Sequence, residues 1–463
     1  MKSLEKLSLI LLIGGLTLAS CKKEGCTDET AENYNEKAKK DDGSCTYATP
    51  TIGDESIASP TFTTNALLAS SKSQEFPQLV LSGSNSGVLW AESPSPCELK
   101  FVGLTSSYAA DGAAGTAVDN TGTISSATDV DANLVYSSSA SKYMTAYVHA
   151  QSSDYGLKGK VFTPSDMTEG VFDIEGPFNY ANERPRYPKM DANGSGTIGV
   201  VYHSSSGTST PSSILFKTVD VSGSSPVVSP AAESTQTGIE LSVGDSDALF
   251  PDIAWNTSAG VFGVVYMVGS GNGRSIKFVT VDASGTIVTS AKTLIPADGL
   301  EVQQPRIVAD GSGFAITWRD FRKVQIGNAE PITGIPAIRF ARCDANGNLT
   351  SASGATDIFD ASDNSLLISN PYMNEVSLYH DLVVKTPGSV YGLIWATQTS
   401  PYEVYFSEVR VSGSTVSASV ESKISGSASS DRVGIASDGS KYIITYTAAK
   451  SGSGYETILG QSN

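Results

Sequence analysis

Residues 250–286 read FPDIAWNTSAGVFGVVYMVGSGNGRSIKFVTVDASGT, and they contain a unit that the rest of the chain repeats. An apolar run begins at Phe250. After a Ser/Gly turn comes a second run that ends at Tyr266, and a third run ends at Asp282. Glycine and asparagine accept the positive φ that a tight hairpin turn needs. The stretch therefore predicts three short antiparallel strands in succession.

The aromatic residue that ends the second run recurs along the chain. Its seven copies are Trp90, Tyr147, Tyr202, Tyr266, Trp318, Trp395 and Tyr446. Most copies have a companion strand upstream, often opened by a proline as in FPQLVLS or QPRIVAD, and several have a third strand downstream that ends in a Gly-rich turn. A long repeat of this kind is typical of propeller blades.

Four short antiparallel strands in each of seven units predict an all-β fold, a seven-bladed β-propeller, with six or eight blades if one weak unit is miscounted. The last unit stops one strand short, after YETILGQS. Residues 59–70 precede the first blade and offer the missing strand. We therefore expect a propeller over residues 59–463 whose N-terminal strand closes the last blade, preceded by a linker at 48–58. Ring closure removes exposed sheet edges.

The N-terminus has the features of an exported protein. Residues 1–20 combine a lysine-bearing start with an apolar run that is short for a membrane-spanning helix, which predicts a signal peptide. LASC (18–21) resembles a bacterial lipobox, and the resemblance implies that Cys21 carries a lipid that attaches the protein to a membrane. An ordinary signal peptide is the alternative. Lys22 favours the outer membrane, at its periplasmic face or at the cell surface.

A short cysteine module is expected at residues 21–47. The stretch GCTDETAENYNEKAKKDDGSCTY (25–47) resembles a small module of cell-surface proteins in the Bacteroidetes. A disulfide between Cys26 and Cys45 would stabilise a piece too small to hold a core. The module's aspartates either make turns or bind calcium, and no other cofactor is expected. These aspartates are Asp28, Asp41 and Asp42.

WRDFR (318–322) is the densest charge cluster at the end of a predicted strand. It resembles a repeat of secreted bacterial propeller proteins in which Trp-x-Asp-x-Arg ends the second strand, and only this copy has the full pattern. The resemblance implies that Asp320 and Arg322 pair across the turn. A ligand-binding cluster is the other interpretation.

The net charge and the missing catalytic motifs limit the classes of function that the sequence favours. The net charge of −17 disfavours a nucleic-acid partner. No GxSxG, HExxH or phosphate-binding loop occurs, and the three histidines are expected at the surface. They are His149, His203 and His380. Sialidase-type propellers use an arginine cluster, but the turn boxes of that family are missing, so no catalytic residue is assigned. The candidate arginines for such a cluster are Arg184, Arg186, Arg306 and Arg319.

Two expanded loops favour a binding face, because long insertions in a regular repeat tend to carry function. They lie at 319–336 and before the sixth repeat. The predicted ligand-binding residues are Arg186, Tyr187, Arg319, Asp320, Arg322, Tyr372 and His380. Polar and aromatic groups together suit glycans or peptides. We expect a non-catalytic binding or display module for protein or glycan partners. The alternatives are a polysaccharide-active hydrolase or lyase and a structural subunit of an envelope assembly.

Overall fold

The computed structural model describes residues 23–29, 31–47, 49–93, 97–112, 115–124, 132–151, 154–178, 184–205, 212–233, 237–297, 299–326, 332–350, 365–372, 376–398, 402–425, 431–450 and 454–463. It comprises a small unit within residues 1–50 and a larger unit from Thr51 onward. The predicted signal peptide and Cys21 lie outside the described residues. Within the described ranges, no helix has the length and apolarity needed to cross a membrane.

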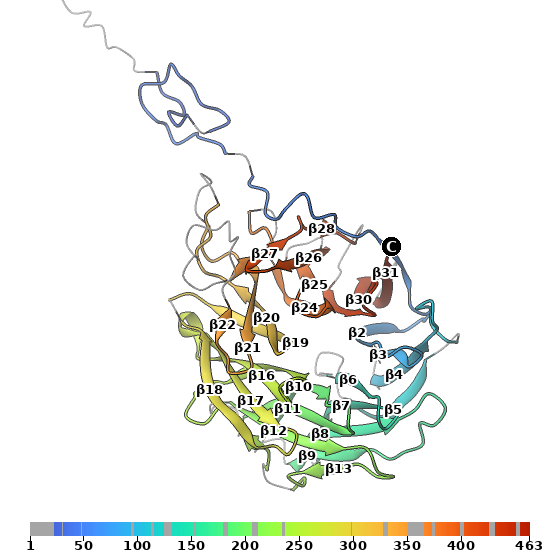
Figure 1. Cartoon of the computed structure of the whole chain (residues 1–463). Coiled ribbons are helices and arrows are strands. Elements are labelled where there is room, and N and C mark those ends of the chain that lie inside the picture. The colour runs from blue at the N-terminus through green and yellow to red at the C-terminus, as the bar shows by residue number, and fades with distance from the viewer. Residues whose placement is uncertain are drawn as a thin grey trace, which may run out of the picture. The chain divides into compact units, whose positions relative to one another are not determined.

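The larger unit is a seven-bladed β-propeller of antiparallel sheets, which confirms the predicted fold (Figure 1). In six blades the strands pair in chain order, and three blades have their outer strand in two short pieces that both pair with the third strand. The blades are β2(Ser73–Val80), β3(Ser86–Ser93), β4(Cys97–Leu104), β5(Thr116–Ile124); β6(Ala132–Ser137), β7(Lys142–Gln151), β8(Asp154–Phe162), β9(Phe172–Phe178); β10(Arg184–Ala192), β11(Thr197–Ser205), β12(Ser213–Asp220), β13(Val227–Ser229), β14(Ile239–Glu240); β15(Leu249–Asn256), β16(Val261–Val268), β17(Ser275–Asp282), β18(Ile287–Ile295); β19(Val302–Asp310), β20(Gly313–Asp320), β21(Ala337–Asp344), β22(Leu349–Thr350), β23(Leu366–Leu367); β24(Val376–Thr386), β25(Val390–Thr397), β26(Val404–Ser412), β27(Thr415–Ala418), β28(Ser422–Lys423); and β29(Asp431–Ser437), β30(Tyr442–Ala449), β31(Tyr455–Ser462) with β1(Phe62–Ala66). A 3₁₀ turn, η2(Gly271–Gly273), precedes β17.

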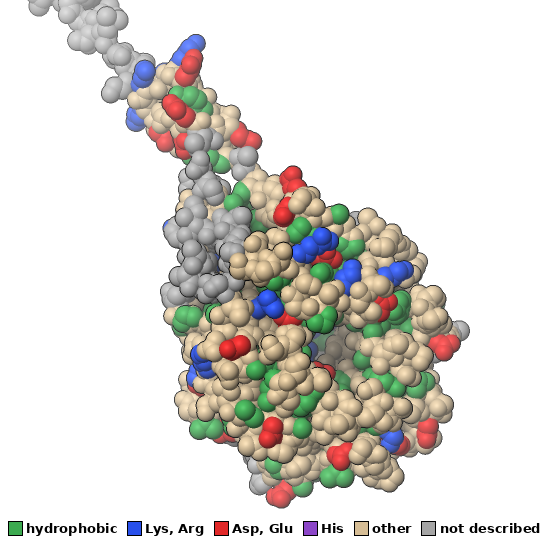
Figure 2. Space-filling model, viewed as in Figure 1, with side chains coloured by type: hydrophobic (Ala, Val, Ile, Leu, Met, Phe, Trp, Pro, Cys, Tyr) green, Lys and Arg blue, Asp and Glu red, His purple; other side chains and the backbone are tan. Residues whose placement is uncertain are grey.

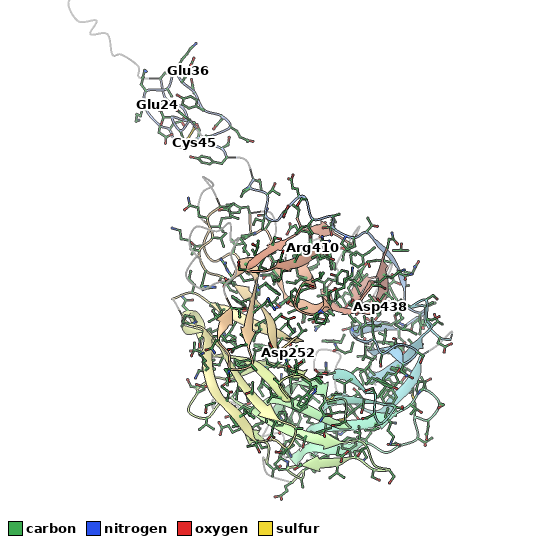
Figure 3. The ribbon with its side chains drawn as sticks, in the orientation of Figure 1. Glu24, Glu36, Cys45, Asp252, Arg410 and Asp438 are labelled. Atoms are coloured by element: carbon green, nitrogen blue, oxygen red, sulfur yellow. A yellow bond between two sulfur atoms is a disulfide. The ribbon has the colours of Figure 1, made fainter. Side chains whose placement is uncertain are left out.

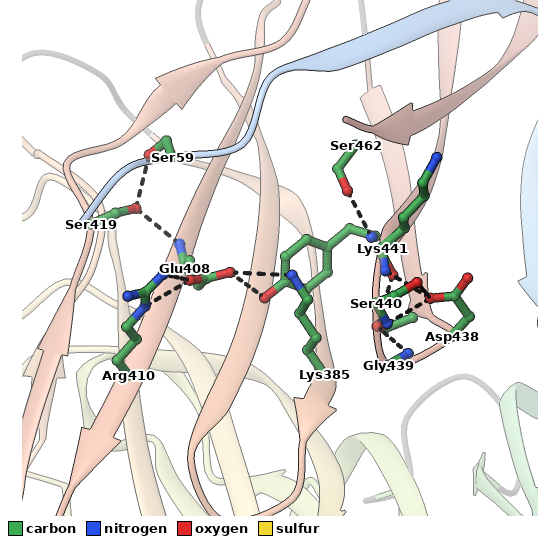
Figure 4. A network of polar contacts seen from close by, with 12 residues as sticks. Ser59, Lys385, Glu408, Arg410, Ser419, Asp438, Gly439, Ser440, Lys441 and Ser462 are labelled. Carbon is green, nitrogen blue, oxygen red and sulfur yellow. Dashed lines mark hydrogen bonds and ion pairs between the residues drawn. The ribbon is translucent and has the colours of Figure 1, made fainter.

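The two ends of the propeller meet in the seventh blade. Strand β1 pairs antiparallel with β31, so a strand from before the first blade completes the last one. Further upstream, the Asp54 amide donates to the Ala418 carbonyl at 2.7 Å, and the Ser59 hydroxyl donates to Ser419 Oγ at 3.0 Å (Figure 4). The segment before β1 is therefore bound to blade six as well. This arrangement leaves the seventh blade without a free outer edge at β31.

The repeated aromatic residue packs between blades. All seven copies are buried, with exposed fractions from 0% to 5%. Trp318, for example, lies in one apolar cluster with Val265 and Phe278 of the preceding blade. Large aromatic side chains bury much apolar area and dominate such interfaces. The repeat that identified the fold is therefore the packing element that holds neighbouring blades together.

Each inner strand is an edge strand that faces the propeller axis, and most inner strands contain a β-bulge. Phe76 and Pro77 together oppose Trp90, and Gln304 and Pro305 together oppose Trp318. Proline has no N–H to donate, so it is tolerated on an edge strand or at a bulge. The prolines therefore lie within the inner strands, at their bulges, and do not open them as the sequence pattern suggested.

Buried polar clusters also connect the blades. Glu408 of β26 is 4% exposed. Its carboxylate accepts hydrogen bonds at 2.8 Å from the Tyr442 hydroxyl of blade seven and at 2.8 Å from Arg410 Nε (Figure 4). Between blades two and three, the fully buried Glu175 pairs with Lys217 Nζ at 2.8 Å. Because a buried charge is tolerated when it is paired and hydrogen-bonded, these clusters serve the structure.

The small N-terminal unit is built around the predicted disulfide between Cys26 and Cys45, which is present. The carboxylates of this unit make turns and local contacts. Asp41 and Asp42 accept from the amides of Gly43 and Ser44 at 3.1 and 3.0 Å, and Asp28 accepts from a tyrosine hydroxyl. Over the described part of the chain, no group of three or more His, Cys, Asp or Glu side chains has the arrangement of a metal site.

Candidate binding site in the axial pocket

The inner strands of all seven blades surround one pocket. It has a volume of about 350 Å³ and is lined by residues of β2, β6, β10, β15, β19, β24 and β29. Figure 2 shows a hollow near the middle of the propeller face, and in Figure 3 the pocket residue Asp252 lies toward the centre of the ring. Pockets of a few hundred Å³ are the size in which proteins bind small ligands or ligand ends.

Bulged residues form the rim of this pocket. At five inner-strand bulges, a residue other than glycine has a φ between 50° and 58°. They are Phe76, Tyr187, Phe250, Gln304 and Arg432, and all five line the pocket. Left-handed backbone is an outlier for bulky side chains and costs on the order of 1–3 kcal/mol at each position. Such strain clusters at ligand sites, because the surrounding structure must hold it in place.

The rim residues form two aromatic groups. In one, the Arg432 guanidinium lies 3.5 Å from the ring centroid of Phe76 and 4.6 Å from that of Tyr379. In the other, the ring centroid of Tyr187 lies 4.8 Å from that of Phe250 and 5.1 Å from that of His203. Flat apolar surfaces beside polar edges are suited to bind sugar rings or peptide planes.

The pocket's carboxylates bind backbone amides of the next blade. Asp252 accepts from the Ile307 amide at 2.9 Å, and Asp381 accepts from the Ile435 amide at 2.9 Å. Burial raises the pKa of Asp381, which Arg306 and the Ile435 amide partly counteract. These carboxylates thus fix the register between blades.

The pocket's arginines contact backbone carbonyls or aromatic rings. Arg306 Nε donates to the His380 carbonyl at 3.2 Å, and Arg306 Nη1 lies 3.5 Å from the Pro305 carbonyl. Among the described residues, neither Arg306 nor Arg432 has a carboxylate within ion-pair distance. Lys189 also lines the pocket. The site therefore combines aromatic surfaces with cationic groups, of which these two arginines lack a contacting counter-charge.

Two of the predicted site residues, Tyr187 and His380, line the pocket. Arg186 precedes Tyr187 in β10, and its charge helps to lower the pKa of His203, which burial brings to about 3. His380 is 2% exposed, and neither of its ring nitrogens makes a hydrogen bond of good geometry with a described residue. Burial, together with Arg306 and Arg319, lowers the pKa of His380 well below its usual range, so the ring is neutral at physiological pH.

The expectation that the histidines lie at the surface was wrong. His149 is 6% exposed, His203 5% and His380 2%. All three belong to strands, β7, β11 and β24, that contact a neighbouring blade. A neutral imidazole is small and partly apolar enough to be buried in such an interface.

Asp320 forms a closed structural cluster. Its carboxylate accepts from Trp318 Nε1 at 2.7 Å and from Arg322 Nη2 at 2.6 Å, and Arg339 Nε lies 3.3 Å away. Asp320 is 1% exposed and Arg322 5%. Burial acts to raise the pKa of Asp320, but the charges of Arg339 and Arg322 outweigh it and keep the pKa below its usual value. The pair is thus enclosed and does not line the axial pocket.

Arg319 and Tyr372 also lie outside the pocket lining. Arg319 donates to the Val376 carbonyl at 3.0 Å and to Gln303 and Gln398, which joins blades five and six. The Tyr372 hydroxyl lies 3.4 Å from the Val324 carbonyl, and its ring packs against a small apolar cluster. Both side chains are engaged in fixing the expanded loops.

Sequence reasoning missed most of the rim. The missed residues are Phe76, Phe250, Gln304, Tyr379 and Arg432, and Arg306 was considered only for catalysis. A signal was present, because four of the five strained residues directly precede the proline of the inner strand or its equivalent in FPQ, YPK, FPD and QPR. Arg432 precedes a valine, so no following proline signals its strained backbone.

The fold was compared with known proteins. No family model matches the chain, and no curated protein matches it. Among solved structures, a protein of unknown function from Dyadobacter fermentans is 9% identical, with a TM-score of 0.46, covering 88% of this chain and 100% of that one. The polysaccharide lyase Uly1 is 10% identical, with a TM-score of 0.47, covering 84% and 90%. The Hadza microbial sialidase Hz136 is 10% identical, with a TM-score of 0.44, covering 82% and 74%. At these values we draw no functional argument from the similarities.

Proposed function

We propose that this chain is a cell-envelope lipoprotein, anchored through Cys21, whose propeller binds a glycan without catalysis in the axial pocket. The anchor follows from the lipobox resemblance at residues 18–21. The propeller supplies a rigid ring that presents one site. Glycan is preferred over an extended peptide, because the pocket is a concave well and most of the strands that line it are interrupted by bulges, whereas an added peptide strand pairs with a regular sheet edge.

The strained aromatic rim is the observation that carries this proposal. Phe76, Tyr187 and Phe250 each occupy left-handed backbone at a bulge that lines the pocket. A folding requirement alone would favour glycine there, since glycine adopts this φ without steric cost. Retaining large aromatic side chains at strained positions supports a use for their surfaces in ligand contact.

A non-catalytic role is supported by the state of the pocket's ionisable groups. Glycoside hydrolysis requires an acid and a base or nucleophile facing the sugar from opposite sides. Asp252 and Asp381 instead bind backbone amides of the next blade. The polysaccharide-active alternative rests on Tyr379 and the neutral His380, which are groups that can transfer protons.

The test is a glycan and polysaccharide array probed with the purified full-length protein, with both bound ligand and released product recorded. We expect binding without product release, and at least about fivefold weaker binding by Phe250→Ala, since a lost aromatic contact costs about 1 kcal/mol or more. Tyr455→Ala removes an exposed ring outside the pocket and is the matched control. Product release would favour the enzyme, and the absence of any glycan binding would contradict the proposal.

A further inference from the structure

The two pocket arginines differ from most arginines elsewhere in the propeller. Arg274, Arg322, Arg342 and Arg410 each have a carboxylate within 3.0 Å. In the pocket, Arg306 contacts backbone carbonyls, and Arg432 contacts aromatic rings. In a chain with a net charge of −17, acidic partners for these two cations would be easy to supply. Within the described residues neither arginine has one, and this distinguishes them from the four arginines above.

The setting of Arg432 directs its hydrogen-bonding groups. Its guanidinium lies over the ring of Phe76 at 3.5 Å and over that of Tyr379 at 4.6 Å, so aromatic rings flank the cation. Stacking uses the faces of the planar guanidinium and leaves the N–H groups at its edge for a hydrogen-bond acceptor. Strained backbone, with a φ of 51°, fixes the residue at the rim. This is a preorganised donor for a planar anion.

The other charges of the pocket favour the same kind of ligand. Lys189 and Arg306 line it together with Arg432, against the two carboxylates Asp252 and Asp381. Each carboxylate accepts a hydrogen bond from a backbone amide, which stabilises it without a ligand cation. The pocket lining thus has one more positive than negative side chain, and its carboxylates are already bound within the protein.

We propose that the axial pocket selects acidic glycans, and that Arg432, with Arg306, binds a uronate carboxylate while the rim aromatics contact the sugar rings. The inference rests on the proposed glycan-binding function and names its ligand class. A carboxylate matches the arginine edge through two parallel N–H···O bonds. A sulfate ester presents similar oxygens to the same fork, so a sulfated glycan is one of the probes.

Calorimetric titration of the full-length protein tests glycan binding and the selection of acidic glycans separately. The probes are polygalacturonate, alginate and hyaluronan oligosaccharides, each paired with its carboxyl-reduced form, and a sulfated galactan. We expect at least one acidic form to bind, about tenfold or more tighter than its reduced partner, with affinity falling as salt rises. Equal binding of both forms would leave a glycan site and overturn acid selection. Tighter binding of the sulfated galactan would overturn the carboxylate assignment. If no glycan binds, the proposed function itself is contradicted.

Substitutions test whether Arg432 is responsible for the preference for acidic glycans. Arg432→Gln is expected to lose the preference for the acidic form, and Arg432→Lys to recover only part of it, because lysine keeps the charge without the planar fork. Arg410→Gln, which removes a half-exposed arginine outside the pocket, is the matched control and should keep the preference. Circular dichroism checks that each variant is folded. A folded Arg432→Gln protein with unchanged acid preference would overturn the assignment.

Discussion

The Asp320 cluster and the axial pocket both place arginines beside aromatic residues, yet they differ in what those arginines contact. In the cluster, Arg322 and Arg339 lie against the carboxylate of Asp320, and Trp318 donates to it as well. In the pocket, Arg432 lies between two rings without a contacting carboxylate among the described residues. A dense run of charges in the sequence therefore indicates an internally satisfied structural element, whereas the binding potential lies where charges are isolated from one another.

Removing the carboxylate at the centre of the cluster should have the largest effect. Asp320→Asn leaves Arg322 and Arg339 buried without a counter-charge, and we expect the free energy of unfolding to fall by about 3–5 kcal/mol. Urea unfolding measures this. Because the pKa of Asp320 is lowered in the folded state, its contribution is present above about pH 4 and is lost as the pH falls further. A loss of stability below about 1 kcal/mol would show that the cluster is dispensable.

The carboxylate of Asp191, which joins blade three to blade four and does not line the pocket, has a pH signature of the opposite sign. Burial raises the pKa of Asp191 to about 6, which the amides of Trp255 and Ala192 only partly offset. A raised carboxyl pKa adds stability at low pH that is lost as the pH rises from about 4 to about 6. Asp191→Asn keeps an acceptor for the Trp255 amide, bonded at 2.7 Å, and should remove this loss, on the order of 3 kcal/mol. Thermal unfolding across this pH range would contradict the assignment if both proteins lost stability equally.

Relief of backbone strain at the pocket rim should give the smallest change in the free energy of unfolding. Gln304 has a φ of 50°, and its buried side-chain oxygen has no hydrogen-bond partner in the described part of the chain. Gln304→Gly should raise the free energy of unfolding by about 1 kcal/mol, because glycine adopts left-handed backbone without cost. At Gln78, a pocket residue of blade one that has no positive φ, Gln78→Gly should lower it by about 0.5–1 kcal/mol. Destabilisation by both substitutions would show that the rim is not strained.

The sequence predicted the fold better than the site, for physical reasons. A buried aromatic between blades must recur once per blade, so copies such as Trp90 and Trp318 allowed the seven blades to be counted. The rim residues depend on a bulge, in which one extra residue and a left-handed φ shift a side chain toward the axis. A following proline marks four of the five bulged positions, but neither the left-handed φ nor the direction of the side chain can be derived from the residue types. The expanded loops near Arg319 and Tyr372 suggested a binding face away from the axis, but the side chains of these two residues are hydrogen-bonded within the protein.

The most direct measurement is a side-by-side titration of Tyr187→Ala and Asp320→Asn with a glycan that the array identifies, at a temperature where both variants are folded. We predict that Tyr187→Ala loses about tenfold or more in affinity, because it removes a ring from the pocket rim, with little change in stability. Asp320→Asn should bind normally while unfolding more easily. Unchanged affinity in Tyr187→Ala together with lost affinity in folded Asp320→Asn would contradict the account and place the site at the cluster.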